Sequence, residues 1–335
     1  EVGGRLLVDR ASFTVMPRDK VGIVGRNGAG KTSLFKVLGG ASEPAAGSIV
    51  CKGGFGYLPQ DPKIDTALDG RTCVTHVLSG RGIDEELVRI EKLRIAMDEN
   101  PDDRNVGRYT RAEERFRTTG GYAAESEARA MAAGLGIPQD RLDLPLGVLS
   151  GGERRRIELA RILFAGSDVL CLDEPTNHLD IDAKAWLMAF LRQYKGALLV
   201  ISHDLELLDE AITRVLHLDR AGEEAVGDLI EYRGTYSQYR RARAEDEIRR
   251  AKKAMQQEKE IARMQAVVDR FGAKATKAAM AHNMEKRIAR VEAERVHAPR
   301  SGKTIIVRVP DPPACGETVI GGTRLCKAYG GHPVF

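Results

Sequence analysis

The chain has 335 residues and a formal net charge of +4. This length is enough for two or three units that each bury a core of their own. No apolar run approaches the roughly 18 residues that cross a bilayer, so we expect no stable membrane insertion by this chain. The five cysteines lack metal-binding spacing and predict reduced thiols, which indicates a cytoplasmic protein.

The positive charge is distributed unevenly along the chain. Between Arg240 and Arg300 there are 17 Lys and Arg against 9 Asp and Glu, a net charge of +8, which leaves −4 for the rest. A cationic module is therefore attached to a mildly acidic one. The first residues, Glu1 to Gly4, resemble the middle of a hairpin, and neither an initiator Met nor a signal peptide precedes them. We interpret residue 1 as an internal cut.

A glycine-rich loop stands between an apolar run, Val21 to Val24, and the helix-prone residues Leu34 to Leu38. The order strand, glycine loop, helix is that of a phosphate-binding P-loop, and this context argues against an ordinary glycine turn. In this pattern Lys31 reaches the β- and γ-phosphates, and the Thr32 hydroxyl binds Mg²⁺. The predicted phosphate-binding residues are Gly25, Arg26, Asn27, Gly28, Ala29, Gly30, Lys31, Thr32 and Ser33.

The segments around this loop predict a small sheet and then a helical region. Apolar runs at Leu6 to Val15 and Ser48 to Leu58 indicate a small antiparallel sheet. Gln60 leaves the second run at a turn marked by two prolines, where a glutamine taken alone is unremarkable. Helical patterns then cover Asp84 to Met97, Val106 to Arg117 and Ala123 to Leu135.

A second candidate phosphate-binding segment opens the helix predicted over Arg154 to Phe164. The sequence there is Leu149-Ser150-Gly151-Gly152-Glu153. Ser150 is a good N-cap residue, and the two glycines expose backbone N–H groups at a positive helix end.

Two further apolar strands end in polar side chains. The first closes with Asp173 and Glu174, and the second, Ala197 to Ile201, is followed by His203. Buried strands of this kind suit the centre of a parallel sheet, whose carboxyl edge binds ligands. At that edge Asp173 could hold Mg²⁺, Glu174 could polarise the water that attacks a γ-phosphate, and His203 could contact that phosphate. A structural histidine is the alternative for His203.

Taken in order, these motifs resemble one complete ATP-binding cassette over residues 1–232. The resemblance implies an α/β P-loop NTPase with a mixed sheet core, a small antiparallel β subdomain and a helical subdomain at about 66–165. It implies ATP and Mg²⁺ as ligands, with Gln60 beside Thr32 and Asp173 at the metal, and Gln60, Glu174 and His203 in catalysis. The signature residues Ser150, Gly151, Gly152 and Glu153 would cap the ATP held by a second, opposite cassette.

Within that superfamily the chain resembles the ABC-F proteins of translation. The segments that carry this likeness are Glu174-Pro175-Thr176-Asn177-His178-Leu179-Asp180, Ile201-Ser202-His203-Asp204 and the residues 232–239. Some members carry a ribosome-contacting arm within the helical subdomain. The insert here is short, so we favour a plain helical subdomain.

A basic linker is expected over 233–300, followed at 301–335 by the start of a second, truncated cassette. Apolar residues repeat at helical spacing on both sides of Phe271-Gly272, which predicts an antiparallel hairpin of two helices of roughly 25 residues. The family resemblance implies that the linker approaches rRNA and P-site tRNA. Cations near the tip are the candidate RNA contacts: Arg263, Arg270, Lys274 and Lys277.

The leading hypothesis is an ABC-F ATPase that acts on the ribosome, in translation regulation or in protection against antibiotics. ATP-driven closure of two cassettes would move the linker, and the missing second cassette would be needed for full activity. One alternative is the ATPase subunit of a membrane exporter, which the basic hairpin argues against. A DNA-associated ATPase is another, since a cationic helical hairpin can bind any polyanion.

Overall fold

The computed structural model of the chain describes residues 7–9, 11–61, 66–220, 226–271, 278–293, 321–329 and 332–333. The chain divides into two units, Glu1–Ala298 and Pro299–Phe335. In the second unit, β7 (Ala328–Tyr329) and β8 (His332–Pro333) pair antiparallel. The other elements named below belong to the first unit.

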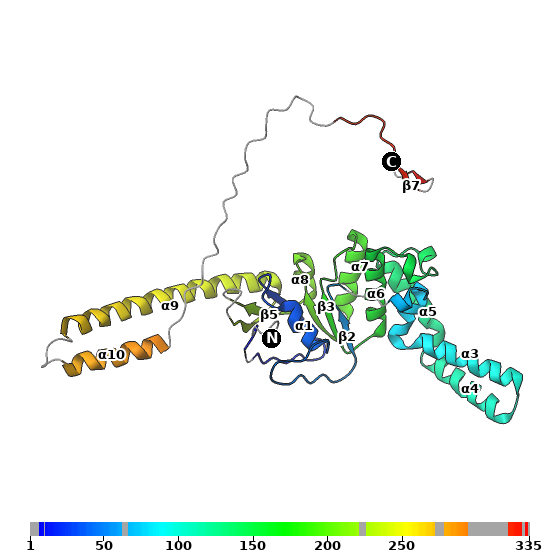
Figure 1. The fold of residues 1–335 in the computed structure, drawn as a ribbon, viewed down its shortest axis with the longest axis horizontal. Coiled ribbons are helices and arrows are strands. Elements are labelled where there is room, and N and C mark those ends of the chain that lie inside the picture. The colour runs from blue at the N-terminus through cyan, green and yellow to red at the C-terminus, as the bar shows by residue number, and fades with distance from the viewer. Residues whose placement is uncertain are drawn as a thin grey trace. The chain divides into compact units, whose positions relative to one another are not determined.

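The first unit is built on a six-stranded sheet with the order β2-β3-β4-β1-β5-β6. Its strands β2, β3 and β5 are labelled in Figure 1. The strands are β1 (Lys20–Gly25), β2 (Phe55–Leu58), β3 (Val169–Asp173), β4 (Ala197–Ile201), β5 (Arg214–Asp219) and β6 (Asp228–Arg233). The first five are parallel, and β6 is antiparallel to β5. The strands predicted from the apolar runs before Gly25, Glu174 and Ser202 are confirmed. Their carboxyl ends meet at one edge, where α/β folds bind ligands.

The residues before and after α1 (Lys31–Leu38) differ from the small antiparallel sheet that the sequence predicted. The run Ser48 to Leu58 contributes only β2, which joins the main sheet parallel to β3. In the described residues up to 54, the β-pairing outside the main sheet consists of a single parallel bridge, between Val8 and Gly227. The small antiparallel sheet is therefore not found in this part of the chain. Gly47 and Gly53 have φ of +86° and +99°, which interrupts an extended strand, and Val50 is exposed.

Hydrophobic side chains of the strands alternate between the two faces of the sheet, so both faces are buried. In β4, Leu199 and Ile201 belong to the core under α1 (Lys31–Leu38). Leu198 and Val200 belong to the core on the opposite face. The helices that contribute to this second core include α6 (Gly151–Ala165), α7 (Ile181–Gln193) and α8 (Leu205–Ala211).

The described residues between β2 and α6 form the predicted helical region. Its α-helices are α2 (Cys73–Leu78), α3 (Ile83–Glu99), α4 (Asp103–Thr118) and α5 (Gly121–Gly134). Short 3-10 turns lie at Thr66–Leu68, Ser79–Arg81, Gln139–Arg141 and Leu146–Val148. The three predicted helices are thus confirmed as α3, α4 and α5, and α3 and α4 run side by side (Figure 1).

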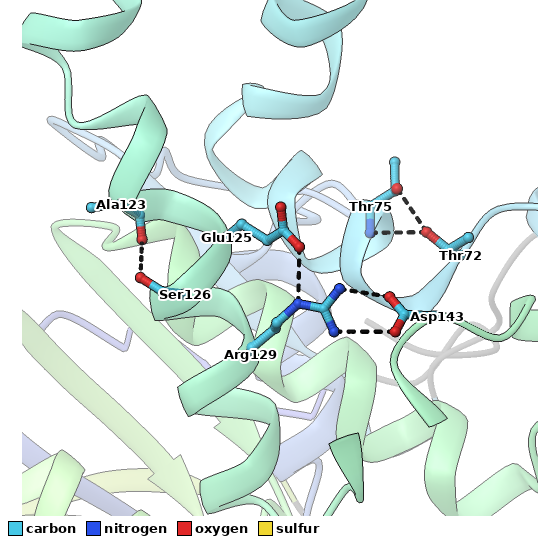
Figure 2. Close-up of polar contacts among 7 residues, drawn as sticks. All are labelled: Thr72, Thr75, Ala123, Glu125, Ser126, Arg129 and Asp143. Atoms are coloured by element: carbon cyan, nitrogen blue, oxygen red, sulfur yellow. Dashed lines mark hydrogen bonds and ion pairs between the residues drawn. The ribbon is translucent and has the colours of Figure 1, made fainter. Parts of the chain in front are cut away.

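An arginine on α5 fixes the loop that leads to α6 (Figure 2). Arg129 contacts both carboxylate oxygens of Asp143, with Nη2 at 2.6 Å and Nη1 at 3.4 Å, and its Nε donates to Glu125 at 2.9 Å. The hydrogen bonds from Arg129 lower the pKa of Asp143. Figure 2 also shows Thr72 accepting a hydrogen bond from the Thr75 N–H, which caps α2.

The linker region contains α9 (Tyr236–Phe271) and α10 (Ala278–Ala293), which lie side by side (Figure 1). The helices are 36 and 16 residues long, where two of roughly 25 were expected. The extra length of α9 comes from its first turns, which pack on β5, β6 and α8 and are not part of the pair that α9 forms with α10. There, Ser237 donates from N and Oγ to Asp209 at 2.6 Å, and Tyr239 is buried.

Candidate nucleotide site

The P-loop leaves β1 at Gly25 and enters α1 at Lys31. Gly28 and Gly30 have φ of +77° and +102°, a conformation that glycine adopts without strain. A Cβ on Gly25 would lie 2.9 Å from the Leu218 backbone oxygen, so the loop passes too close to β5 for a side chain there. The conformation of the loop therefore favours glycine at these three positions, in keeping with the predicted P-loop.

Lys31 folds back over this loop. Its Nζ donates to the backbone oxygens of Gly25 at 2.8 Å and Arg26 at 3.2 Å. Burial lowers the pKa of Lys31, while the charges of Glu174 and Asp173 oppose that shift. An ammonium beside the backbone N–H groups at the N-terminus of α1 fits the phosphates of a nucleotide. Gly30 caps α1 without a side-chain hydrogen bond, which leaves those N–H groups for a ligand.

Asp173 and Glu174 lie at the end of β3, next to the P-loop. Asp173 is fully buried, and in the part of the chain that the structure describes neither of its carboxylate oxygens makes a hydrogen bond of full geometry, the Thr32 hydroxyl being a weak partner. Burial raises its pKa, while the Thr32 hydroxyl and the charges of Arg155 and Lys31 lower it. A buried carboxylate with only this weak partner fits a hard cation such as Mg²⁺, with nucleotide phosphates completing the coordination.

Glu174 is also buried, with an exposure of 6%. Its Oε2 accepts a hydrogen bond from the His203 N–H at 3.2 Å, and its Oε1 lies 3.5 Å from His203 Nε2. Burial raises the pKa of Glu174, against the lowering effect of the His203 N–H. A carboxylate with a raised pKa at the same sheet edge as Lys31 is suited to accept a proton. The structure therefore places Glu174 and His203 together, as the sequence predicted.

The signature segment begins α6 with a capping box. The Ser150 side chain accepts from the Glu153 N–H, and Glu153 Oε2 accepts from the Ser150 N–H at 2.9 Å. The Ser150 N–H also lowers the pKa of Glu153. The carboxylate of Glu153 is thus engaged by the cap, whereas Gly151 and Gly152 remain open to a cavity.

That cavity has a volume of about 680 Å³ and brings together several predicted residues. Thr32, Gln60, Gly151 and Gly152 line it. No functional role was predicted for the six other residues that line it: Lys36, Pro59, Asp61, Arg155, Asn177 and His178. The burial of Arg155 could have been predicted from the sequence, because it lies on the same face of α6 as the buried Leu159, four residues later.

The predicted RNA contacts lie on the linker. Arg263 and Arg270 are exposed on α9, whereas Met264 on the same helix is buried. Lys274 and Lys277 lie outside the described residues. No helix within the described ranges has the length and apolar composition to span a membrane.

The model of the ABC transporter family matches residues 8–177, and a second model with the same description matches residues 224–306. The chain belongs to the ATP-binding cassette family. Within it the chain is an ABC-F protein, as its motifs predicted, and it has the predicted P-loop ATPase fold.

Three ABC-F relatives cover most of this chain. It is 36% identical over 85% of its length to the Probable ATP-binding protein YheS of Haemophilus influenzae, covering 43% of that protein. It is 32% identical over 96% to the Tylosin resistance ATP-binding protein TlrC of Streptomyces fradiae, covering 64% of it. It is 31% identical over 99% to the Energy-dependent translational throttle protein EttA of Mycobacterium tuberculosis, covering 58% of it. The chain thus spans about half the length of these relatives.

Proposed function

We propose that residues 1–232 form a cassette that binds Mg²⁺ and ATP and hydrolyses the nucleotide. The P-loop and Lys31 hold the phosphates, and Thr32, Asp173 and Gln60 hold the metal. Mg²⁺ supplies charge neutralisation of the β- and γ-phosphates. Glu174 orients and deprotonates the attacking water, and His203 contacts the γ-phosphate. The observation that carries this proposal is the buried Glu174, whose pKa burial raises, beside a P-loop and a fully buried Asp173.

In the full-length protein, 301–335 begins a second cassette, and two cassettes close head to tail around two ATPs. Ser150, Gly151 and Gly152 then cap the ATP of the opposite P-loop. Closure moves the linker, 233–300, whose α9 is tied to the cassette at Asp209 and Tyr239. ATP binds the closed form more tightly than the open one, and this difference in affinity sets how far ATP can raise the population of the closed form. The position of the linker follows that population.

The ribosome is the proposed partner, with rRNA and P-site tRNA near the tip of the linker, and the cytoplasm the proposed location. Support comes from the relative named a translational throttle and from the exposed cations Arg263 and Arg270. The relative named for tylosin resistance supports ribosome protection against an antibiotic as a second candidate. The exporter and DNA-associated alternatives remain as outcomes of the test.

The test is pelleting of full-length protein carrying Glu174→Gln with 70S ribosomes, in ATP or ADP, with duplex and branched DNA as competitors. The matched control adds Lys31→Ala, which removes the phosphate contact. We expect ATP-dependent pelleting that DNA does not compete away and that the control loses. Absence of pelleting with either nucleotide, or full competition by DNA, would contradict the ribosomal role.

A further inference from the structure

Arg155 is a buried arginine of α6, five residues after Ser150. It is 8% exposed, and its Nη2 donates to the backbone oxygens of Asp173 at 3.0 Å and Glu174 at 2.8 Å. Taking a guanidinium out of water is costly unless polar or charged partners compensate. Burial lowers the pKa of Arg155, and the charges of Asp173, Asp61 and Glu174 raise it. The partners of this buried charge are thus the backbone oxygens of Asp173 and Glu174, together with the charges of Asp173, Asp61 and Glu174.

The backbone that Arg155 contacts is in an unusual conformation. Glu174 has φ of +52°, in the left-handed region that non-glycine residues seldom occupy. Its N–H donates to Ile201 O at 2.8 Å, and its oxygen accepts from the Asn177 N–H at 3.3 Å. Arg155, at 2.8 Å, is the nearer of the two donors to that oxygen. This turn directs the carboxylate toward His203, so a change in the turn would displace the carboxylate.

We propose that Arg155 is a positioning residue for ATP hydrolysis, because it fixes the backbone from which the Glu174 carboxylate projects. The inference rests on the proposed function, in which Glu174 activates water. Arg155 also belongs to the same helix as Ser150, the proposed contact to the ATP of the opposite cassette. The position of the α6 N-terminus is thereby linked to the geometry of Glu174.

The next residue of α6 offers a matched control. Arg156 Nη1 donates to two consecutive backbone oxygens, of Gly136 at 2.9 Å and of Leu135 at 3.4 Å. It carries the same charge on the same helix and makes the same kind of contact, but its oxygens belong to the helical subdomain. If Arg155 only stabilised the fold, replacing Arg156 should therefore have the same effect as replacing Arg155.

The experiment uses the full-length chain with the corresponding catalytic glutamate of the second cassette changed to Gln, so that hydrolysis reports the first site. ATP affinity, the single-turnover hydrolysis rate and thermal melting are measured for Arg155→Met, Arg155→Lys and Arg156→Met. We expect Arg155→Met to lower the rate at least about 10-fold with ATP affinity within about two-fold, because misplacing the carboxylate affects the chemical step. Arg155→Lys keeps a donor and recovers part of the rate, and Arg156→Met stays within about two-fold of the parent.

Three results would overturn the inference while leaving the proposed function intact: an unchanged rate in Arg155→Met, an equal loss in Arg156→Met, or a loss of rate in Arg155→Met matched by a loss of ATP affinity. If Arg155→Met shows no cooperative thermal melting, Arg155→Lys takes its place as the test. A hydrolysis rate in Arg155→Lys equal to that of the parent would then overturn the inference. A parent that hydrolyses no ATP would instead overturn the proposed function.

Discussion

A buried ion-pair network in the helical subdomain shows how single residues support the site. Glu158 of α6 contacts His76 Nε2 through Oε2 at 2.8 Å, and it accepts from Arg161 Nη2 through Oε1 at 2.6 Å. Burial alone would raise the pKa of Glu158, but the hydrogen bonds from His76 and Arg161 outweigh it and lower the pKa to about 2. The network joins α2 to α6, the helix that carries Ser150.

This network predicts an acid-sensitive contribution to stability. Because the folded-state pKa of Glu158 lies below its unfolded value of about 4.3, the contribution is full above pH 4.3 and is lost as pH falls toward 2. It amounts to the order of 3 kcal/mol. We expect Glu158→Gln to lower the free energy of unfolding at pH 7, and the gap to the parent to narrow by more than about 1 kcal/mol between pH 5 and pH 3.

Urea unfolding at the two pH values measures this gap. The control is Glu210→Gln, which removes an exposed carboxylate paired with Arg192 and should change stability by less than about 1 kcal/mol at either pH. A gap between the Glu158→Gln variant and the parent that is independent of pH would contradict the assignment.

At the residue scale, the sequence indicates those candidate site residues whose chemistry is local. Lys31 and Thr32 follow from the glycine pattern, and Glu174 from its place after an apolar strand. Arg155 was missed, because its partners are backbone oxygens on a strand that only the tertiary fold brings near. Asn177 and His178 were recognised as family motif, but the cavity that they line depends on how β3 and α6 meet.

At the element scale, apolar runs predicted the central strands, which bury both faces of the sheet. Helical patterns predicted α3, α4 and α5, of which α5 buries a regular face through Ala124, Ala128 and Ala132. The run Ser48 to Leu58 was mispredicted, since β2 pairs in parallel with β3, a partner more than a hundred residues away. The length of α9 was underestimated for a similar reason. Its first turns pack through Tyr239 on the sheet, and a helical pattern does not show what a helix packs against.

The exposed face of α9 predicts phosphate contact by Arg263 and Arg270. In the full-length Glu174→Gln protein with ATP, changing both to Gln should reduce the slope of log affinity for ribosomes against log salt by about 1 to 2, since each lost phosphate contact removes about 0.7 to 0.9. Affinity measured from 50 to 200 mM salt gives this slope.

The matched control for this slope is Arg249→Gln. Arg249 lies on the same helix, but its charge is already paired with Asp246. We expect its salt dependence to equal that of the parent. An unchanged slope in the Arg263 and Arg270 double variant would remove these residues from the interface.

At the scale of the whole molecule, the proposed function depends on two cassettes. The cavity lined by Thr32 and Gly152 belongs to one chain, whereas the proposed closed state brings the signature of a second cassette onto this P-loop. A shift from 1% to 99% closed requires ATP to bind the closed state about 10⁴-fold more tightly than the open one. Hydrolysis at this site should therefore be measured in the full-length protein.

The most direct measurement is single-turnover ATP hydrolysis by the full-length protein whose second site is inactivated, with and without Glu174→Gln. We expect Glu174→Gln to lower the rate at least about 100-fold with ATP affinity unchanged, because general-base catalysis contributes about 10²- to 10⁴-fold. The parent rate should fall with decreasing pH at a point above the ordinary carboxylate pKa of about 4.3, since burial raises the pKa of Glu174. Undiminished hydrolysis by the variant would contradict the assignment of Glu174 as the base.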